Sequence, residues 1–317
     1  MSARSPETVL WDFLRGALMT RALGQVADLD VAEALADGPV AVADLADTVG
    51  ADRDTLHRLL RALASDGVFA ETEPGVFRNT ETSELLRDPS QRAFAHLFAG
   101  VWHQAVGDLD AAAGKPTFPP RFGSDFWSWL AEHPAERAAF DSAMVGGFES
   151  RLERLASLDW RGDETIVDVG GGNGTLLLEF FRGQPGLRGI VFDLPETVRD
   201  ERTFADRIDF VPGSFFERVP AAEVYVLATI LHDWDDESAA AILRTIGASA
   251  PPGARLVILD GVVAPGNEPD GTKWLDLLML ALFGGRERTE PQWRALLDGA
   301  GLRPTRVDDG LIEARWR

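Results

Sequence analysis

The sequence contains no cysteine among its 317 residues. Disulfide bonds, thiolate metal sites and cysteine nucleophiles are therefore excluded. The sequence also lacks an apolar run of membrane-spanning length, and its N-terminus has no basic stretch followed by an apolar core, so we expect a cytoplasmic protein. Internal repeats and low-complexity tracts are absent as well.

Positive charge is scarce. The chain has 31 Lys and Arg residues against 51 Asp and Glu residues, which gives a formal net charge of −20. Nucleic acids are bound through Lys and Arg side chains that neutralise phosphates, so this composition disfavours a nucleic-acid partner. It disfavours anionic membrane surfaces for the same reason. It is compatible with a cationic ligand, although the overall charge says little about any one pocket.

The length suggests two domains, and a hydrophobic content of 45% is enough for two cores. Residues 6–35 repeat apolar side chains at every third or fourth position, which predicts a helix. Such a helix needs an apolar partner, either within a small domain or on a second subunit. Its first apolar positions are Val9, Leu10, Phe13, Leu14, Ala17 and Leu18.

Residues 42–80 have the pattern of helix, turn, helix and two short strands, which together resemble a winged helix. The second helix has an N-cap candidate in Asp52 or Asp54, and the strands, 68–70 and 76–77, flank a turn at 73–75. A DNA-binding function is disfavoured, because residues 41–80 contain seven acidic residues and only four arginines. A recognition helix needs basic residues for phosphates.

Residues 89–158 are helical in pattern and rich in aromatic side chains, with a loop at 115–123. Most of these side chains have the spacing of ordinary core residues. Aromatic and Met side chains in such number could also line a pocket for a flat, apolar ligand. The residues are Phe94, Phe98, Trp102, Phe126, Trp127, Trp129, Phe140, Met144 and Phe148.

From Trp160 onward, apolar strands alternate with helices, which predicts an α/β domain with a doubly wound sheet. Residues 305–307 and 311–316 could form a hairpin at its edge. The other expected strands are 166–169, 190–192, 208–211, 224–228 and 255–260, and the expected helices are 175–181, 239–246, 275–282 and 291–300.

A glycine loop follows the first of these strands, and Asp168 lies near the end of that strand. Gly170, Gly172 and Gly174 remove side chains where a ligand must approach the backbone closely. The dinucleotide fingerprint would need a further glycine where Thr175 stands, and the Gly-Lys-Ser/Thr of a P-loop is missing too. A glycine-rich turn without a ligand is the alternative interpretation.

Asp193 lies at the end of the second strand, 23 residues after Gly170. A carboxylate at this distance can accept both hydroxyls of a ribose. A nucleoside without a diphosphate therefore fits the pattern better than a dinucleotide does. The alternative is that Asp193 is a turn residue that caps the next helix.

His232 follows the fourth strand, on the ligand side of the sheet, and is one of five histidines. It could accept a proton near neutral pH, or it could be structural. The acidic residues next to it fit helix capping better than a metal site. They are Asp233, Asp235, Asp236 and Glu237.

Together these motifs resemble the homodimeric, S-adenosylmethionine (SAM)-dependent O-methyltransferases of plant and bacterial specialised metabolism, the caffeate and polyketide type. The resemblance spans nearly the whole chain. It rests on residues 167–174 (Val-Asp-Val-Gly-Gly-Gly-Asn-Gly), 192–195 (Phe-Asp-Leu-Pro), 231–236 (Leu-His-Asp-Trp-Asp-Asp) and 285–289 (Gly-Arg-Glu-Arg-Thr), and on Gly213, Phe215 and Phe216.

The resemblance implies a Rossmann-like class I methyltransferase sheet in residues 91–317 and a winged-helix-like dimerisation domain in residues 1–90. The connection at 91–158 would line the acceptor pocket. It also implies a homodimer formed through the N-terminal helices, SAM as cofactor with S-adenosylhomocysteine as its product, an aromatic acceptor methylated at a phenolic hydroxyl, and no metal.

The resemblance also assigns roles to individual residues. His232 matches the general base, and Asp260 and Glu287 match the acidic residues that orient it. Phe140, Met144 and Met279 match positions that line the acceptor pocket. The cofactor would lie among Asp168, Gly170, Gly172, Gly174, Asp193, Leu194, Gly213, Ser214, Phe215 and Trp234.

Two positions depart from the family pattern. Ser214 stands where the family usually has an aspartate at the adenine, and a hydroxyl binds an amine less strongly than a carboxylate does. Ala228 stands where many members have lysine. The sequence leaves open C- or N-methylation, for example at an indole or an activated carbon. It also leaves open a non-methylating relative (a decarboxylase, hydroxylase or pericyclase) that uses SAM structurally, and a ligand-sensing transcription factor.

Overall fold

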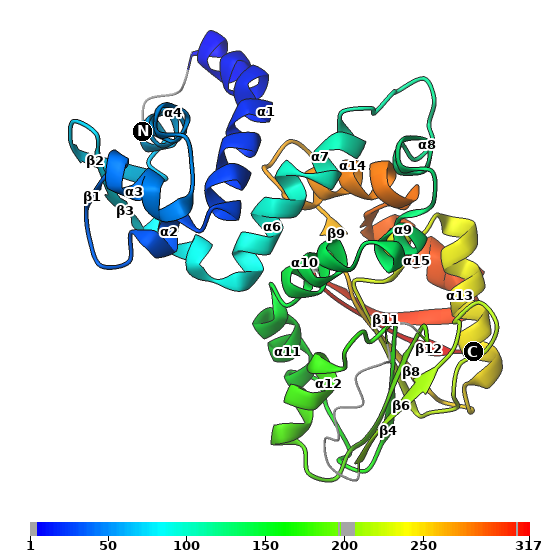
Figure 1. Cartoon of the computed structure of the whole chain (residues 1–317). Coiled ribbons are helices and arrows are strands. Elements are labelled where there is room, and N and C mark those ends of the chain that lie inside the picture. Colours follow the sequence, from blue (N-terminus) through cyan, green and yellow to red (C-terminus); the bar gives the residue numbers. More distant parts are fainter. Residues whose placement is uncertain (1–4, 196, 198–206, 309) are drawn as a thin grey trace. The chain divides into compact units, whose positions relative to one another are not determined.

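The computed structural model describes residues 5–195, 197, 207–308 and 310–317. The chain divides into two compact units (Figure 1). The first comprises Met1–Gly107 and Trp127–Gly146, and the second comprises Asp108–Phe126 and Gly147–Arg317. Residues 91–107 and 127–146, which the sequence analysis attached to the second domain, thus pack with the first unit. The predicted boundary near residue 90 itself stays a prediction.

The first unit contains the expected helix–turn–helix and wing. Helices α3 (Val42–Val49) and α4 (Arg53–Ser65) precede strands β2 (Phe69–Glu73) and β3 (Val76–Asn79). A short strand that the sequence analysis missed, β1 (Val40–Ala41), pairs with β3 and completes a three-stranded antiparallel sheet. Asp52 caps α4 by accepting the backbone N–H of Thr55, as one of the two predicted caps should.

Helix α1 (Pro6–Asp28) ends earlier than the predicted helix over 6–35, because Asp30 adopts a left-handed conformation with φ of 53°. A separate turn, α2 (Val31–Ala34), follows. The C-terminal half of α1 is buried, and Gly24 lets it cross close to Ala99 of α6 (Pro89–Ala99). The unit also contains α5 (Glu81–Glu84), η1 (Leu85–Arg87), α7 (Val101–Val106) and α10 (Pro134–Met144), with α9 (Phe126–Glu132) at its boundary.

The second unit is built on a seven-stranded sheet of order β11-β12-β8-β7-β4-β5-β6. Five strands are parallel: β4 (Thr165–Val169), β5 (Arg188–Asp193), β6 (Ile208–Pro212), β7 (Val224–Ala228) and β8 (Arg255–Leu259). The predicted hairpin at the edge is present as antiparallel β11 (Leu302–Asp308) and β12 (Leu311–Trp316). The α/β fold class is therefore confirmed.

Helices cover both faces of this sheet, as Figure 1 shows. Residues of α13 (Asp236–Ser249) and α15 (Glu290–Gly299) pack on one face, and residues of α11 (Phe148–Ala156) and α12 (Thr175–Phe180) pack on the other. The remaining elements are α8 (Phe118–Phe122), which lies within the predicted loop, η2 (Phe181–Gly183), η4 (Leu231–Asp233), β9 (Val262–Val263), α14 (Thr272–Phe283) and β10 (Arg288–Thr289).

The strand order reverses at β4. The chain runs from β4 to β5 and β6 on one side and then returns to β7 and β8 on the other. Ligands of such sheets bind outside the carboxyl ends of the strands, at the point where the order reverses. Val169, Asp193, Ala228 and Leu259 end the four strands nearest this point. No helix in the described part of the chain is both long and apolar enough to cross a membrane.

Candidate functional site

The glycine loop joins β4 to α12 at the point where the strand order reverses. Gly170, Gly172 and Gly174 all have positive φ values, of 75°, 59° and 77°, a conformation that glycine adopts without steric cost. A Cβ at Gly170 would lie 2.5 Å from Ile230, and one at Gly174 would lie 2.9 Å from Val191. A Cβ at Gly172 would meet no atom of the described residues within 4 Å. Of the three glycines, only Gly172 therefore faces space that a ligand could fill.

Two carboxylates adjoin this loop. Asp193 accepts the backbone N–H of Gly172 at 2.8 Å and that of Leu194 at 2.6 Å, so its carboxylate lies against the loop. Asp168 is buried, and its Oδ2 has no hydrogen-bond partner among the described residues. Burial, together with the charge of Asp193, raises the pKa of Asp168 to about 7, while Arg151 opposes the shift. A buried acceptor of this kind fits a ligand that brings a donor or a positive charge.

An aromatic cluster lies beyond the ends of β6 and β7. The rings of Phe215, Phe216 and Trp234 contact one another edge to face, with centroids 4.8 to 5.9 Å apart. Gly213 lies against the Phe192 ring, where a Cβ would come within 2.6 Å. The Ser214 hydroxyl accepts the backbone N–H of Phe216 at 3.3 Å. This surface can hold a planar ring, with Ser214 as a polar group beside it.

His232 lies in η4, just after β7, and is 9% exposed. Its Nδ1 lies 2.7 Å from Oε1 of Glu287 and 4.0 Å from Oδ1 of Asp260. Its Nε2 lies 3.5 Å from Oδ1 of Asp233. A carboxylate only accepts hydrogen bonds, so the proton between His232 and Glu287 belongs to Nδ1, which leaves Nε2 free to take a proton. The structure thus brings together the three residues predicted as base and orienting acids.

The charges around His232 shift its titration. Burial alone would lower the pKa of the imidazole, but Asp260, Asp233 and the hydrogen bond to Glu287 outweigh burial and raise it to about 10. Burial raises the pKa of Asp233 to about 7 and that of Asp260 to about 6, in each case against the pull of His232. The usual pKa of a phenol is about 10. With a pKa of about 10, His232 carries a proton at neutral pH and becomes able to accept a phenolic proton only as the pH rises towards that value.

Among the four neighbouring acids, Asp235 caps α13 by accepting the backbone N–H of Ser238 at 2.8 Å, and Asp236 and Glu237 lie in the first turn of that helix. Asp233 is instead buried beside His232. Within residues 5–195, 197, 207–308 and 310–317, no group of three or more His, Asp or Glu side chains is placed to hold a metal ion.

The three residues matched to an acceptor pocket come from different units. Phe140 and Met144 lie on α10 of the first unit, where the Phe140 ring meets Trp127 edge to face at 5.5 Å. Met279 lies on α14 of the second unit and is buried. That the three residues contribute to one acceptor site stays a prediction.

Sequence reasoning overlooked several residues near the site. Arg151 of α11 is close enough to Asp168 and Asp260 that their charges favour its protonated form, against a burial that lowers its pKa. Thr229 has a φ of 54°, which is unusual for a β-branched residue. Arg288 is fully buried. In the sequence, Arg288 is marked only by its place in the matched motif at 285–289. Nothing in the sequence distinguishes Arg151 or Thr229.

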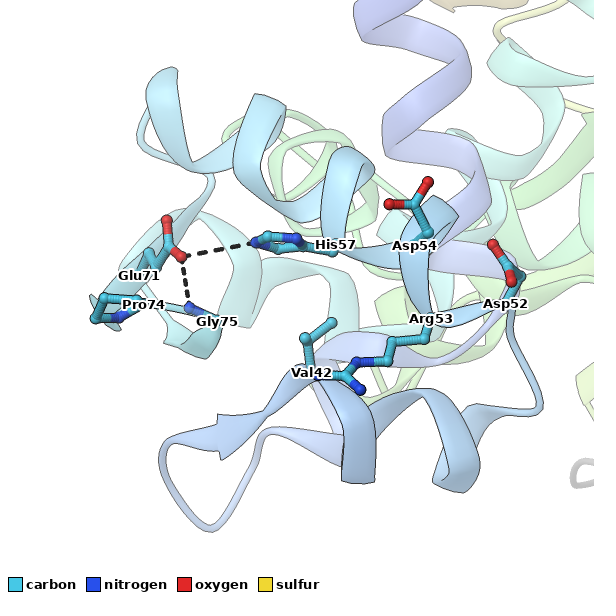
Figure 2. Close-up of a pocket in the computed structure, with 8 residues that line it drawn as sticks. All are labelled: Val42, Asp52, Arg53, Asp54, His57, Glu71, Pro74 and Gly75. Atoms are coloured by element: carbon cyan, nitrogen blue, oxygen red, sulfur yellow. Dashed lines mark hydrogen bonds and ion pairs between the residues drawn. The ribbon is translucent and has the colours of Figure 1, made fainter.

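A separate pocket of about 560 Å³ lies in the first unit, between α4 and the wing (Figure 2). His57 lies 3.8 Å from Glu71, which also accepts the backbone N–H of Gly75. The pocket contains none of the predicted site residues. Its lining is Val42, Asp52, Arg53, Asp54, His57, Glu71, Pro74 and Gly75.

The chain matches two protein-family models. Residues 102–303 match the O-methyltransferase domain, and residues 11–88 match the O-methyltransferase dimerisation domain. A phenazine O-methyltransferase from Lysobacter antibioticus is 35% identical over 97% of this chain and 96% of its own length.

Two solved structures show the same fold. The structure of a mitomycin 7-O-methyltransferase superimposes with a TM-score of 0.90 at 34% identity, covering 98% of both chains. That of an O-methyltransferase from neocarzinostatin biosynthesis has a TM-score of 0.81 at 34% identity and covers 94% of this chain and 95% of its own. The latter holds S-adenosylhomocysteine and 1,4-dihydroxy-2-naphthoic acid.

Proposed function

Since the chain belongs to the SAM-dependent O-methyltransferases that carry a dimerisation domain, we propose that it methylates a phenolic hydroxyl of an aromatic small molecule, with His232 as the general base. The observation that carries the proposal is the 2.7 Å hydrogen bond from His232 Nδ1 to Glu287, because it leaves Nε2 as the nitrogen that receives the proton. By their names, the three relatives described above are a phenazine O-methyltransferase, a mitomycin 7-O-methyltransferase and an O-methyltransferase from neocarzinostatin biosynthesis, the last in complex with a dihydroxynaphthoic acid.

The residues around the reversal of strand order fit the cofactor. Asp193, with Leu194 beside it, would accept the ribose hydroxyls, and the open space at Gly172 would let the ligand approach the backbone closely. The orphaned Oδ2 of Asp168 suits the positively charged methionyl end. Gly213, Ser214, Phe215 and Trp234 would form the adenine side. SAM supplies a methyl group activated by its sulfonium centre.

The base works through its surroundings. Glu287 fixes the imidazole tautomer and stabilises the charge that develops when Nε2 takes the phenolic proton. Asp260 adds to that stabilisation from 4.0 Å. Most of the rate gain would come from holding the acceptor oxygen in line with the methyl carbon, since positioned reactants avoid most of the entropic cost of encounter.

Phe140, Met144 and Met279 match acceptor-contacting positions in the family resemblance, and their apolar side chains suit a flat aromatic molecule. We also propose a homodimer, in keeping with the dimerisation domain. The surface that supports it is the N-terminal half of α1, where large apolar side chains are exposed. They include Leu10, Trp11, Phe13, Leu14 and Leu18.

The decisive experiment compares wild type with His232→Asn. Phenols such as dihydroxynaphthoates are incubated with SAM, and product formation is followed by mass spectrometry. We expect methyl transfer to fall by about 10²- to 10⁴-fold, the usual contribution of a general base, while calorimetric binding of S-adenosylhomocysteine stays as in wild type. Near-normal turnover in the variant would rule out His232 as the base.

A further inference from the structure

The segment after α14 runs alongside the segment that carries His232. The backbone N–H of Arg286 donates to the carbonyl oxygen of His232 at 2.8 Å. Gly285 makes this approach possible, because a Cβ there would overlap the carbonyl groups of His232 and Asp233. The side chain of the next residue, Glu287, reaches the imidazole. The two segments are therefore in contact along their length and not only at the catalytic pair.

The side chain of Arg288 also connects the two segments. Its guanidinium donates to the carbonyl oxygen of Leu231 at 2.7 Å and to that of Trp234 at 2.8 Å. These two carbonyls lie on either side of the dipeptide His232-Asp233. The Arg288 side chain thus forms hydrogen bonds to the backbone on both sides of His232.

The surroundings of Arg288 keep it fixed. The side chain is fully buried and lies over the Trp293 ring, 5.2 Å from its centroid. Its Nε donates to Asp236 at 2.9 Å, and the second oxygen of Asp236 accepts from Arg286. Burial lowers the pKa of Arg288, and Asp236 opposes that shift. A buried charge persists only when it is paired and hydrogen-bonded, which here requires all three partners.

We propose that Arg288 is a positioning residue for the methyl transfer: its guanidinium fixes the backbone on both sides of His232, so that the imidazole keeps its hydrogen bond to Glu287. The proposal rests on His232 being the general base. Arg288 and Glu287 are neighbours in sequence, so one short segment supplies both the acid that orients the ring and the group that fixes the backbone carrying it.

The geometry requires a guanidinium. Three N–H groups in a planar fork point at Leu231, Trp234 and Asp236 at the same time. The ammonium of a lysine is a compact charge on a flexible stem and cannot span three acceptors arranged for a fork. Arg288→Lys therefore keeps the charge and removes the geometry.

The test compares Arg288→Lys with Arg294→Lys, a matched change at an exposed arginine of the same region that pairs with Glu290. We expect kcat to fall by about 10²-fold in Arg288→Lys, as for a small misplacement of a catalytic group. The control should keep the wild-type kcat. Asp236→Asn, a milder change at an exposed carboxylate, should lower kcat in the same direction by less.

A second readout separates positioning from simple loss of structure. The imidazole signal of His232, assigned by its loss in His232→Asn, is titrated by NMR without cofactor. In Arg288→Lys it should titrate at lower pH than in wild type, because the ring leaves Glu287. A wild-type titration and a wild-type kcat in folded Arg288→Lys would overturn the proposal. If Arg288→Lys does not fold, the same two measurements on Asp236→Asn decide it, and wild-type values there overturn the proposal as well.

The failure of this proposal is distinguishable from failure of the proposed function. If His232→Asn abolishes turnover and Arg288→Lys leaves it unchanged, only the positioning role of Arg288 is refuted. If His232→Asn turns over normally, the base itself is wrong, and the NMR titration would still report whether Arg288 fixes the ring.

Discussion

Gly172 differs from the other glycines of its loop in what surrounds it. Gly170 and Gly174 approach protein side chains, whereas Gly172 has a positive φ and open space around its missing Cβ. The glycine pattern in the sequence predicts a ligand loop but treats the three positions alike. Only the packing of Ile230, Val191 and Phe210 against the loop separates them, and this packing comes from strands far apart in sequence.

We predict that Gly172→Ala weakens the binding of S-adenosylhomocysteine, because the new methyl group occupies the ligand's space. The left-handed backbone should also cost about 1–2 kcal/mol of unfolding free energy. Gly253→Ala is the matched control, since Gly253 has a φ of 83°, open space around its Cβ and a position in the turn before β8. Calorimetry and thermal unfolding of both variants should show equal destabilisation and a binding defect only at Gly172. An equal affinity in both would refute the assignment.

Glu287, together with Asp260 and Asp233, should influence the pH dependence of turnover. The nearby carboxylates raise the pKa of His232 to about 10. At a pH below this pKa, His232 already carries a proton and cannot accept another. We therefore expect kcat to increase as the pH rises towards about 10. Glu287→Gln removes one of these causes and should move the rising limb to lower pH while lowering the maximal rate. The profile of kcat against pH measures this.

Glu290→Gln is the control for that profile, because Glu290 is exposed and pairs only with Arg294 in the described contacts. Its rising limb should coincide with that of wild type. A profile of Glu287→Gln that also coincides with wild type would show that Glu287 does not influence the base.

At the scale of elements, the sequence predicted the βα units and the edge hairpin, because alternating apolar runs and glycine turns are local signals. It did not predict where the first helix breaks. Asp30 takes a left-handed conformation there, and its carboxylate pairs with Arg92 of α6. Arg92 is 62 residues from Asp30 in the sequence. The apolar periodicity of residues 6–35 therefore cannot indicate this ion pair.

Three helices of the first unit meet at His96. Its Nδ1 lies 2.7 Å from Asp28 at the end of α1, and its Nε2 lies 3.2 Å from Glu136 of α10. Arg92 on the same helix pairs with Asp30, and Arg137 on α10 pairs with Asp141. Burial would lower the pKa of His96, but the two carboxylates outweigh it and raise the pKa. A protonated His96 therefore joins α1, α6 and α10, the helix that carries Phe140 and Met144.

We predict that this contact makes stability depend on pH. A raised pKa means that the folded state binds the proton more tightly than the unfolded state, so the stabilisation is complete below about 6.5, the unfolded value. It is lost as pH rises through the higher folded value. The melting temperature of wild type should therefore fall relative to that of His96→Gln as pH increases above neutrality.

His133→Gln is the control, because His133 contacts Trp129 within its own helical region and bridges no carboxylate in the described residues. Its melting temperature should follow wild type across the same pH range. A constant difference between wild type and His96→Gln at all pH values would contradict the prediction.

At the scale of the whole molecule, the sequence indicated two domains, but it did not indicate that residues 91–107 and 127–146 pack with the first of them. Residues 127–146 return to the first unit after the chain has entered the second. Helices α10 and α6 pack together, for example through His96 and Glu136, which are 40 residues apart. The family resemblance implies a single boundary at residue 90, whereas the interleaving of the chain depends on tertiary contacts between residues far apart in sequence.

The exposed apolar side chains of α1 predict that two copies of the chain associate through this helix. A helix whose N-terminal half exposes large apolar side chains is unstable alone in water, and patches of this kind mark association surfaces. Leu14 is 67% exposed and Leu18 is 73% exposed. Leu14→Glu would place a charge in an apolar interface, where an unpaired charge is costly. Light scattering coupled to gel filtration should show a dimer for wild type and a monomer for this variant.

Leu85→Glu is the matched control. Leu85 is 59% exposed in η1 of the same unit and lies outside α1, so the same chemical change should leave the dimer intact. Because both leucines are exposed within the chain, neither substitution disturbs a core, and a change of mass confined to Leu14→Glu would locate the interface on α1. A dimeric Leu14→Glu, or a monomeric wild type at micromolar concentration, would remove α1 as the surface through which two copies associate.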